Sequence, residues 1–436
     1  MDKSVGYRRN KSYKGRKCEY SSDEMSDSYQ DALKHSLVTL SSKNTKPDDS
    51  DEDKNPTDCR IEFVKNILVD NILRPMIDFD NCDTDLIDTS LNKKILDGKQ
   101  LFTSMKVKLK YLKSGTTGHT FKAVSKVDKN VAFAVKVCAY PIDDYGHMNK
   151  LERPENAELR ILKLLSYFVI NKSTPHFVLP IGSFNTSITH FINIPKNIID
   201  LEDEKNEMYK KFVDRYYENE FESIVSVLIS EWCNGGDLLD YIRKNYERMN
   251  LRMWIIIIFQ ILYTLAKIHQ KYPSFRHNDM KANNILIQMT DIGKNQPDRR
   301  YCYGLDDKKF IIPNINMQIK IWDFDFACID GIIENNKVNS DWTRRINITK
   351  KQNKYYDIHY FFNTLISKRF FPKFYDGGAP SEIVEFVHRI VPEKYRNGSK
   401  HVNKKGRIQV DDEYTTPYRV IMQDPLFSKY RFNQDE

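Results

Sequence analysis

The stretch FRHNDMKANNILI, residues 275–287, joins a set of polar side chains directly to an apolar run. The polar members are His277, Asp279, Lys281 and Asn284. The apolar run predicts a short β-strand, so these side chains should lie on a loop that ends against a sheet. A carboxylate, an ammonium group and a carboxamide held together can align a hydroxyl, neutralise a phosphate and bind a metal ion. The alternative is a polar loop of chance composition, and the rest of the chain decides between the two.

Phosphoryl transfer needs a cradle for nucleotide phosphates, a cation that binds them, a carboxylate that holds magnesium and a carboxylate that aligns the acceptor hydroxyl. KSGTTGHTF, residues 113–121, is a candidate cradle, because Gly115 and Gly118 let backbone N–H groups approach phosphates closely. The alternative is an ordinary hairpin turn, in which glycines are common.

Lys136 is the candidate cation. It lies in FAVKVC, an otherwise apolar strand, where a half-buried ammonium group needs an anion. Glu158 on the predicted helix AELRILKLL can supply that anion while the lysine holds nucleotide phosphates, and Glu155, one turn earlier, competes for the same role. The alternative is an edge lysine whose ammonium group reaches solvent.

Two carboxylates end the apolar run IKIW within IWDFDFA, residues 321–327. Asp323 is placed to hold Mg²⁺ or Mn²⁺ in a cleft, and the alternative is an aspartate that caps a helix or a turn. Beside such an ion, we expect Asp279 to orient the acceptor hydroxyl, Lys281 to neutralise the transferred phosphate and Asn284 to bind a second magnesium ion. All the parts occur in one chain in a consistent order, which favours a catalytic loop over chance.

These motifs resemble the signature set of eukaryotic-type protein kinases over roughly residues 106–432. SGTTG resembles a reduced Gly-rich loop, AVK the VAIK strand, HNDMKANN the HRDLKxxN loop and DFD the DFG triplet. The resemblance implies an α+β fold in two lobes: a small antiparallel β-rich N-lobe with one main helix and a larger, mainly α-helical C-lobe. It also implies a serine/threonine protein kinase that uses ATP with Mg²⁺ or Mn²⁺ and acts on protein substrates.

SEWCNGGDLLDYI, residues 230–242, resembles the hinge of these kinases and the helix after it. On that resemblance the backbone of Glu231 and Cys233 would face adenine, and Asp237 would reach the ribose. Ser230 would hold the gatekeeper position, where a small residue predicts room for bulky ATP-competitive inhibitors.

A closer resemblance is to the virion-assembly serine/threonine kinases of poxviruses and related large DNA viruses. DFDFACIDGII and NKYYDIHYFFNTL carry this resemblance, and Asp357 in the second segment would anchor the backbone of the catalytic loop. The resemblance implies a viral kinase that acts in the host cytoplasm, with packaging in the virion and viral structural proteins among its substrates as further expectations.

The chain departs from the family pattern at several positions. Asn278 replaces an arginine that in many kinases binds an activation-loop phosphate, so we expect activity without that phosphate. Asp325 replaces the glycine of DFG, which is expected to stiffen the triplet. Lys113 and Thr120 replace the first glycine and the valine of the Gly-rich loop. No APE triplet follows the DFD segment, which leaves the recognition motif of the substrates open.

The chain is predicted to hold three regions: a charged, disordered tail at 1–58, a helical extension at 59–105 and the kinase domain at 106–432. Within the domain, the N-lobe would span 106–232 with an insertion at about 185–223, and the C-lobe 233–432 with an insertion at about 288–318. MWIIIIFQILYTLA, residues 253–266, is predicted to form a buried helix, because fourteen residues are too few to cross a bilayer.

Three rival functions were weighed. A pseudokinase or scaffold would bind nucleotide without turnover, but Lys136, Asp279 and Asp323 are all present. A small-molecule kinase of the aminoglycoside or choline type would typically lack a lysine two residues after the aspartate, so Lys281 favours a protein acceptor. The net charge of +8 and the basic N-terminal arm suggest a nucleic-acid-binding protein, but aromatic residues in the arm are too sparse for stacking. The arm is a candidate contact for a membrane or an acidic partner.

The seven cysteines are scattered and form no CxxC pair, which predicts free thiols in a reducing compartment rather than a structural zinc site. The first residues carry basic side chains without the apolar segment of a secretory signal, so we expect a soluble protein that is not exported.

Overall fold

A computed structural model describes residues 56–68, 73, 75–79, 89–91, 93–115, 118–290 and 299–433. The predicted tail lies almost wholly outside these ranges. Its last three residues do not, because helix α2 spans Pro56–Leu68 and begins before the predicted boundary at residue 59. The extension predicted to be helical at 59–105 is helical only in part, since α2 stops at Leu68 and Pro75 makes a β-bridge to Gly182.

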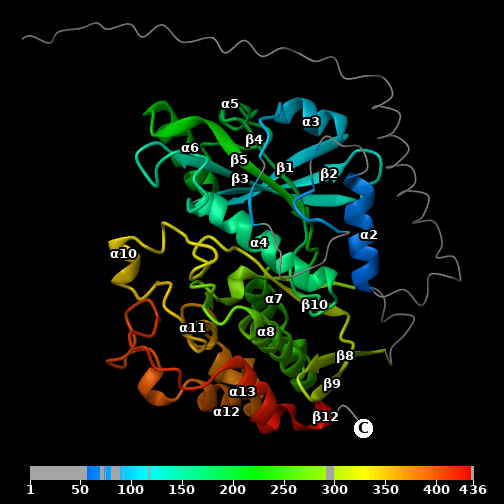
Figure 1. The fold of residues 1–436 in the computed structure, drawn as a ribbon, viewed down its shortest axis with the longest axis vertical. Coiled ribbons are helices and arrows are strands. Elements are labelled where there is room, and N and C mark those ends of the chain that lie inside the picture. Colours follow the sequence, from blue (N-terminus) through cyan, green and yellow to red (C-terminus); the bar gives the residue numbers. More distant parts are fainter. Residues whose placement is uncertain are drawn as a thin grey trace, which may run out of the picture.

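The N-lobe is built on one antiparallel sheet with the strand order β1-β2-β3-β5-β4 (Figure 1). In β2, buried side chains alternate with partly exposed ones, as expected for a strand with one face against a core, whereas β3, in the middle of the sheet, is buried without interruption from Val135 to Tyr140. Helix α4 packs beneath the sheet and begins at a proline, whose missing N–H costs nothing in the first turn. The elements are β1 Val107–Ser114, β2 His119–Ser125, β3 Ala132–Pro141, α4 Pro154–Ile170, β4 Pro180–Ser187 and β5 Phe221–Glu231.

The insertion between β4 and β5 is shorter than predicted, because the strands themselves include residues 185–187 and 221–223. It holds helix α5, Thr189–Ile192, a single 3₁₀ turn, Glu204–Asn206, and helix α6, Glu207–Tyr217. The rings of Tyr209 and Phe212 on α6 lie 4.7 and 4.3 Å from the ring of His119. The insertion therefore covers the start of β2, next to the predicted phosphate cradle.

The C-lobe surrounds helix α8, Leu251–Lys271, which is longer than the predicted apolar run. The side chain of Asn250 caps it by accepting a hydrogen bond from the backbone N–H of Met253 (3.0 Å). At 21 residues α8 is long and apolar enough to cross a membrane, so the argument from length was wrong. Its burial within the lobe, rather than its length, explains its composition.

The polar residue in the middle of α8 is matched to a strand. Gln260 accepts a hydrogen bond from the backbone N–H of Ile319 (2.8 Å) and donates one to the carbonyl of Met317 (3.3 Å). These bonds fix the strand that leads into the DFD triplet against the core helix. The other helices in the described part of the C-lobe are α7 Leu238–Asn245, α10 Asp341–Arg344, α11 Tyr356–Leu365, α12 Ser381–Ile390 and α13 Pro417–Gln423, with short 3₁₀ and π segments between them.

Short strand pairs frame the catalytic loop. Strand β6, Phe275–Arg276, pairs with β11, Cys328–Ile329, and β7, Ile285–Met289, pairs with β10, Met317–Ile321. Because β7 and β10 extend into the predicted insertion at 288–318, the inserted segment is only 290–316. Its described part is a hairpin, β8 Arg300–Leu305 and β9 Lys308–Pro313, to which the last strand, β12 Arg431–Asn433, adds.

The segment before the kinase domain packs onto the N-lobe instead of forming a separate unit. Helix α3, Gly98–Ser104, lies at the outer end of the sheet, and α2 lies beside the hinge (Figure 1). Arg60 on α2 donates two hydrogen bonds to the carboxylate of Glu231 (2.9 and 2.8 Å), and Phe63 stacks on Phe133 of β3. The extension therefore contacts the segment that joins the two lobes.

Candidate active site

The backbone of the catalytic loop is held by one buried carboxylate. Asp357, at the start of α11, accepts hydrogen bonds from the backbone N–H groups of His277 (2.8 Å) and Asn278 (2.9 Å). Asn278 adopts a left-handed conformation with φ of 63°, which asparagine tolerates better than most residues. The Nε2 atom of His277 lies 3.0 Å from the carbonyl oxygen of Trp322, just before the DFD triplet. Asp357 occupies the anchoring position that the family resemblance predicted.

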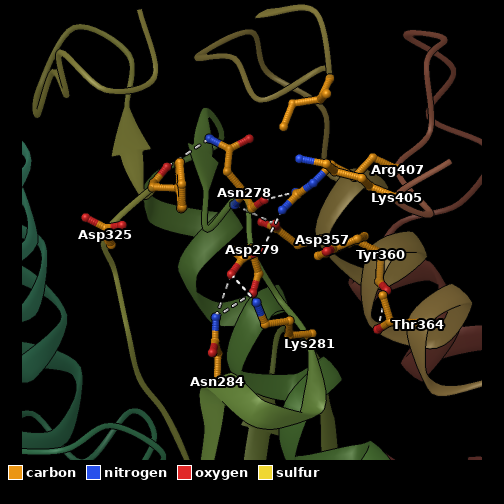
Figure 2. A network of polar contacts seen from close by, with 12 residues as sticks. Asn278, Asp279, Lys281, Asn284, Asp325, Asp357, Tyr360, Thr364, Lys405 and Arg407 are labelled. Atoms are coloured by element: carbon orange, nitrogen blue, oxygen red, sulfur yellow. Dashed lines mark hydrogen bonds and ion pairs between the residues drawn. The ribbon is translucent and has the colours of Figure 1, made fainter. Parts of the chain in front are cut away.

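Asp279 lies at the centre of the polar network in Figure 2. Its Oδ2 atom accepts hydrogen bonds from the ammonium group of Lys281 (2.7 Å) and the amide of Asn284 (2.9 Å). The same amide also donates to the backbone carbonyl of Asp279 (2.9 Å). The fold thus brings together the carboxylate, the lysine and the asparagine of the opening motif.

Lys136 joins the two lobes by contacting two carboxylates. Its Nζ atom lies 2.5 Å from Oε1 of Glu158 on α4 and 3.1 Å from Oδ1 of Asp323. Glu155 pairs instead with Arg153 (3.1 Å), so Glu158 rather than its competitor meets the lysine. The predicted cation and the predicted magnesium ligand therefore belong to one cluster.

The charges of this cluster shift one another's pKa. Burial alone would lower the pKa of Lys136, but Glu158 and Asp323 raise it well above its ordinary value. Burial would raise the pKa of Asp323, but Lys136 lowers it below its ordinary value. Lys136 therefore stays protonated and Asp323 stays ionised at neutral pH, as binding of phosphates and a divalent cation requires.

The two glycines of the predicted cradle differ in how much room a side chain would have. A Cβ atom on Gly118 would lie 2.9 Å from the sulfur of Cys138 and 3.2 Å from Cε of Lys136, so only glycine fits there without displacement. At Gly115 the nearest atom to such a Cβ is 3.7 Å away, and its backbone N–H donates to the carbonyl of Gly118 (2.8 Å). Residues 116 and 117 at the tip of the loop lie outside the described residues.

The predicted hinge residues are placed at the junction of the lobes, at and after the end of β5. Ser230 is buried and lies opposite Ala134 of β3. Cys233 is also buried, and burial raises the pKa of its thiol to about 12. The side chain of Glu231 bonds to Arg60, whereas that of Asp237 caps helix α7 by accepting from the N–H of Asp240 (2.9 Å). Contacts of the Glu231 and Cys233 backbone with adenine and of Asp237 with ribose stay predictions.

The last residue of the DFD triplet has a partner of its own. The carboxylate of Asp325 forms a buried ion pair with Lys337, and its backbone carbonyl accepts a hydrogen bond from Asn335 (3.0 Å). A glycine could make no such ion pair. The contact ties the triplet to the following segment, in line with the predicted stiffening.

The catalytic loop holds the segment after the triplet through hydrogen bonds to uncharged backbone carbonyls of that segment. Arg276 donates to the carbonyls of Asn347 (2.8 Å) and Lys351 (3.1 Å), and Asn278 donates to the carbonyls of Phe326 (3.0 Å) and Thr349 (3.1 Å). The residue that replaces the family's arginine therefore fastens this segment with its own amide.

Sequence reasoning missed three cationic residues of the site. Lys337 belongs to no motif, Arg276 lies in the opening stretch but was given no role, and Arg407, which pairs with Asp279, lies 128 positions away from it. A buried arginine or lysine leaves no periodic signal, so only their positive charge within apolar surroundings could have marked them as candidates.

Comparison with known proteins agrees with this geometry. The family model described as protein tyrosine and serine/threonine kinase matches residues 208–343. The chain is 62% identical over 428 residues to R400 of Acanthamoeba polyphaga mimivirus, a protein provisionally named a serine/threonine-protein kinase, covering 98% of this chain and 91% of the relative.

More distant relatives match over shorter lengths. Serine/threonine-protein kinase 2 of vaccinia virus is 37% identical over 112 residues, 25% of this chain and 22% of the relative. Mimivirus R301, likewise provisionally named a serine/threonine-protein kinase, is 39% identical over 80 residues, 18% of this chain and 20% of the relative. The two-lobed architecture and the near-full-length relative show that this chain belongs to the serine/threonine protein kinase family.

Proposed function

We propose that this kinase transfers the γ-phosphoryl group of ATP to serine and threonine hydroxyls of proteins, with magnesium as the metal. The observation that supports this most is the joint placement of Lys136 against Glu158 and Asp323, with Asp279 bonded to Lys281 and Asn284 nearby. These side chains supply the cation for the phosphates, the carboxylate for magnesium and the carboxylate for the acceptor hydroxyl that phosphoryl transfer requires.

The donor atoms fit a divalent cation. Asp323 offers a carboxylate that is 37% exposed, and Asn284 directs its amide nitrogen to Asp279, which leaves its amide oxygen as the ligand atom. Magnesium is usually bound by one or two carboxylates together with substrate phosphates, so a closed cage of protein ligands is not needed. Bound there, the ion would neutralise charge on the phosphates.

The chain's own residues have separate roles in this proposal. Lys136 binds nucleotide phosphates and is held in place by Glu158. Asp279 accepts a hydrogen bond from the acceptor hydroxyl and aligns its oxygen for attack. Lys281, next to that carboxylate, stabilises negative charge on the transferred group. Gly118 allows the cradle to lie against β3 beside Lys136.

The nature of the acceptor is tested with labelled γ-phosphate. Wild-type protein and Lys136→Met are incubated with labelled Mg·ATP and either a generic protein acceptor or free sugars and choline. We expect label on serine and threonine of the protein acceptor, lost in the variant. Label on sugars or choline alone would assign the chain to the small-molecule branch of the fold. Nucleotide binding without any transfer would make it a scaffold.

We also propose that activity does not depend on a phosphate in the segment after the DFD triplet. Asn278 and Arg276 hold this segment through backbone carbonyls, which need no added charge. Phosphatase treatment should therefore leave the rate of peptide phosphorylation unchanged within about twofold. An obligatory phosphate in residues 323–355, detected by mass spectrometry together with loss of activity on its removal, would contradict this.

The viral relatives suggest where the enzyme acts. We propose a role in virion assembly, with action in the host cytoplasm, packaging in the virion and viral structural proteins as substrates. The proposal is supported by the resemblance of the DFD and YYD segments and by the local match to a vaccinia virus kinase. Proteomics of purified virions and of infected-cell cytoplasm tests it, and absence of the kinase from both fractions would contradict it.

A further inference from the structure

A tight turn from the C-terminal part of the chain reaches the catalytic loop (Figure 2). Val402 and Ile408 form a β-bridge at its base, and the backbone N–H of Asn403 donates to the carbonyl of Arg407 (2.9 Å). Gly406 has φ of 82°, which glycine adopts without strain. The turn thereby directs the side chain of Arg407 inward, where only 5% of it is exposed.

The guanidinium of Arg407 contacts two consecutive residues of the catalytic loop. Its Nη2 atom donates to Oδ1 of Asp279 (2.5 Å), and its Nη1 atom donates to the backbone carbonyl of Asn278. The group is itself fixed, because it lies 4.0 Å from the ring centre of Tyr360 and donates to the hydroxyl of Tyr356 (3.0 Å). A planar guanidinium held on its face and at its edge has little freedom to rotate.

These contacts fix the orientation of the carboxylate. Lys281 and Asn284 occupy Oδ2 of Asp279, and Arg407 occupies Oδ1 from the other side. Each carboxylate oxygen can accept about two hydrogen bonds, so a site remains on Oδ1 for the acceptor hydroxyl. Burial alone would lower the pKa of Arg407, but Tyr356, Tyr360 and Asp279 raise it, so the cation persists.

The same turn is attached to the segment after the DFD triplet. The side chain of Asn347 donates to the carbonyl of Ile408 (2.7 Å), and that of Asn403 donates to the carbonyl of Ile346 (3.4 Å). Arg407 is therefore linked at once to that segment and to Asp279. In this chain the guanidinium beside Asp279 comes from the turn, whereas position 278 is an asparagine.

We propose that Arg407 is a positioning residue for phosphoryl transfer: it holds the carboxylate of Asp279 in the orientation that aligns the acceptor hydroxyl and connects that orientation to the segment after the triplet without a phosphate. This inference rests on the proposed role of Asp279. It assigns a functional residue to a part of the chain that carries none of the kinase motifs.

The test is a kinetic comparison of wild type, Arg407→Met and Arg407→Lys. Because misplacement of a catalytic group by about 1 Å costs on the order of 100-fold, we expect kcat of Arg407→Met to fall about 100-fold. The KM for ATP should stay within about twofold, since Arg407 contacts neither Lys136 nor Asp323. Arg407→Lys should be more active than Arg407→Met, because an ammonium group can still contact one of the two acceptor oxygens. It should be less active than wild type, because it cannot contact both. Addition of millimolar ethylguanidinium should restore part of the activity of Arg407→Met.

Matched controls separate positioning from folding. Arg389→Met removes an arginine that makes two 2.9 Å bonds to Asp424, far from the loop, so ethylguanidinium should not change its rate. In the Asp279→Asn background, Arg407→Met should cause less than a tenth of its effect on kcat in the wild type. If Arg407→Met does not fold, the same comparisons are made with Arg407→Lys.

The outcomes distinguish this inference from the proposed function. A wild type that transfers no phosphate, or an Asp279→Asn variant as active as wild type, would overturn the proposed function itself. An active wild type with Arg407→Met and Arg407→Lys at full kcat would overturn only the inference. The inference would also be overturned if Arg407→Met lowered kcat, ethylguanidinium did not restore it, and the reduction were equally large in the Asp279→Asn background.

Discussion

Replacement of Arg60 by methionine tests whether the segment before the kinase domain supports the hinge. Arg60 donates to both carboxylate oxygens of Glu231 (2.9 and 2.8 Å) and to the carbonyls of Pro175 (2.9 Å) and Phe177 (2.6 Å). The arginine and glutamate side chains are only 14% and 12% exposed. In the variant, Glu231 would keep the hydrogen bond from the backbone N–H of Leu179 (2.6 Å), but its charge would lose its cation.

The magnitude follows from the burial of the pair. Removing one partner of a buried ion pair costs about 3–5 kcal/mol, because the other charge is left uncompensated. The lower end applies here, since Arg60 also lowers the pKa of the buried Lys320 and its loss relieves that repulsion. An unfolding entropy of about 2.1 cal/mol/K per residue over the roughly 350 described residues converts about 3 kcal/mol into a fall in Tm of about 4 °C.

The assay is thermal unfolding of Arg60→Met, Glu231→Gln and the double variant. We expect the double variant to be more stable than Arg60→Met, because Glu231→Gln removes the carboxylate that Arg60→Met leaves without its cation. As a control, Arg215→Met removes an exposed pair, 44% and 43% exposed, and should cost no more than about 1 kcal/mol. Equal midpoints for Arg60→Met and wild type, or effects of the two single changes that simply add, would refute the coupling.

Three further predictions follow from local geometry. Gly118→Ala should raise the KM for ATP about tenfold or more, because overpacking against Cys138 and Lys136 costs about 1–3 kcal/mol. Gly115→Ala should change the KM for ATP by less than about twofold, and equal effects of the two substitutions would contradict the steric argument. His359 is buried with its pKa lowered to about 4, so the folded state resists protonation and stability falls as pH drops below about 6.5. His359→Gln should thus lose about 2 kcal/mol less than wild type between pH 7 and 5 in denaturant titrations, and parallel pH profiles would count against this. Bulky ATP-competitive inhibitors should bind wild type about tenfold tighter than Ser230→Phe, and equal affinities would show that the hinge register is wrong.

The catalytic core was predictable because its chemistry is local in the sequence. Asp279, Lys281 and Asn284 lie within six positions, and their spacing before an apolar strand defines their arrangement. The sequence also offered Glu158 as the partner of Lys136 with Glu155 as a competitor, and the ion pair with Lys136 selects Glu158. The two-lobed α+β fold, which the resemblance to protein kinases implied, is confirmed.

The residues that complete the site could not be predicted in the same way. Arg60 meets Glu231 across 171 positions, and Arg407 meets Asp279 across 128 positions. Such pairs depend on how the chain folds back on itself, and no periodic pattern encodes them. Element ends were also missed, because β4 and β7 continue into stretches that were predicted to be insertions.

The length of α8 shows how a correct conclusion can rest on a wrong reason. The apolar run predicted a buried helix because it seemed too short for a bilayer, yet the helix extends from Leu251 to Lys271. The extra turns carry polar residues, so the hydrophobic run underestimated the helix. The burial of α8 is explained by its packing against the rest of the C-lobe and not by its length.

The most direct test of the central claim is the rate of phosphate transfer by Asp279→Asn at saturating Mg·ATP, with ATP affinity measured in parallel. Asparagine keeps the shape of the side chain but removes the charge that orients the acceptor hydroxyl. The proposed mechanism predicts unchanged ATP affinity and a fall in kcat of about 10²–10⁴-fold, the usual contribution of a general base. Transfer by the variant within tenfold of wild type would contradict the assignment of Asp279 as the residue that aligns the acceptor.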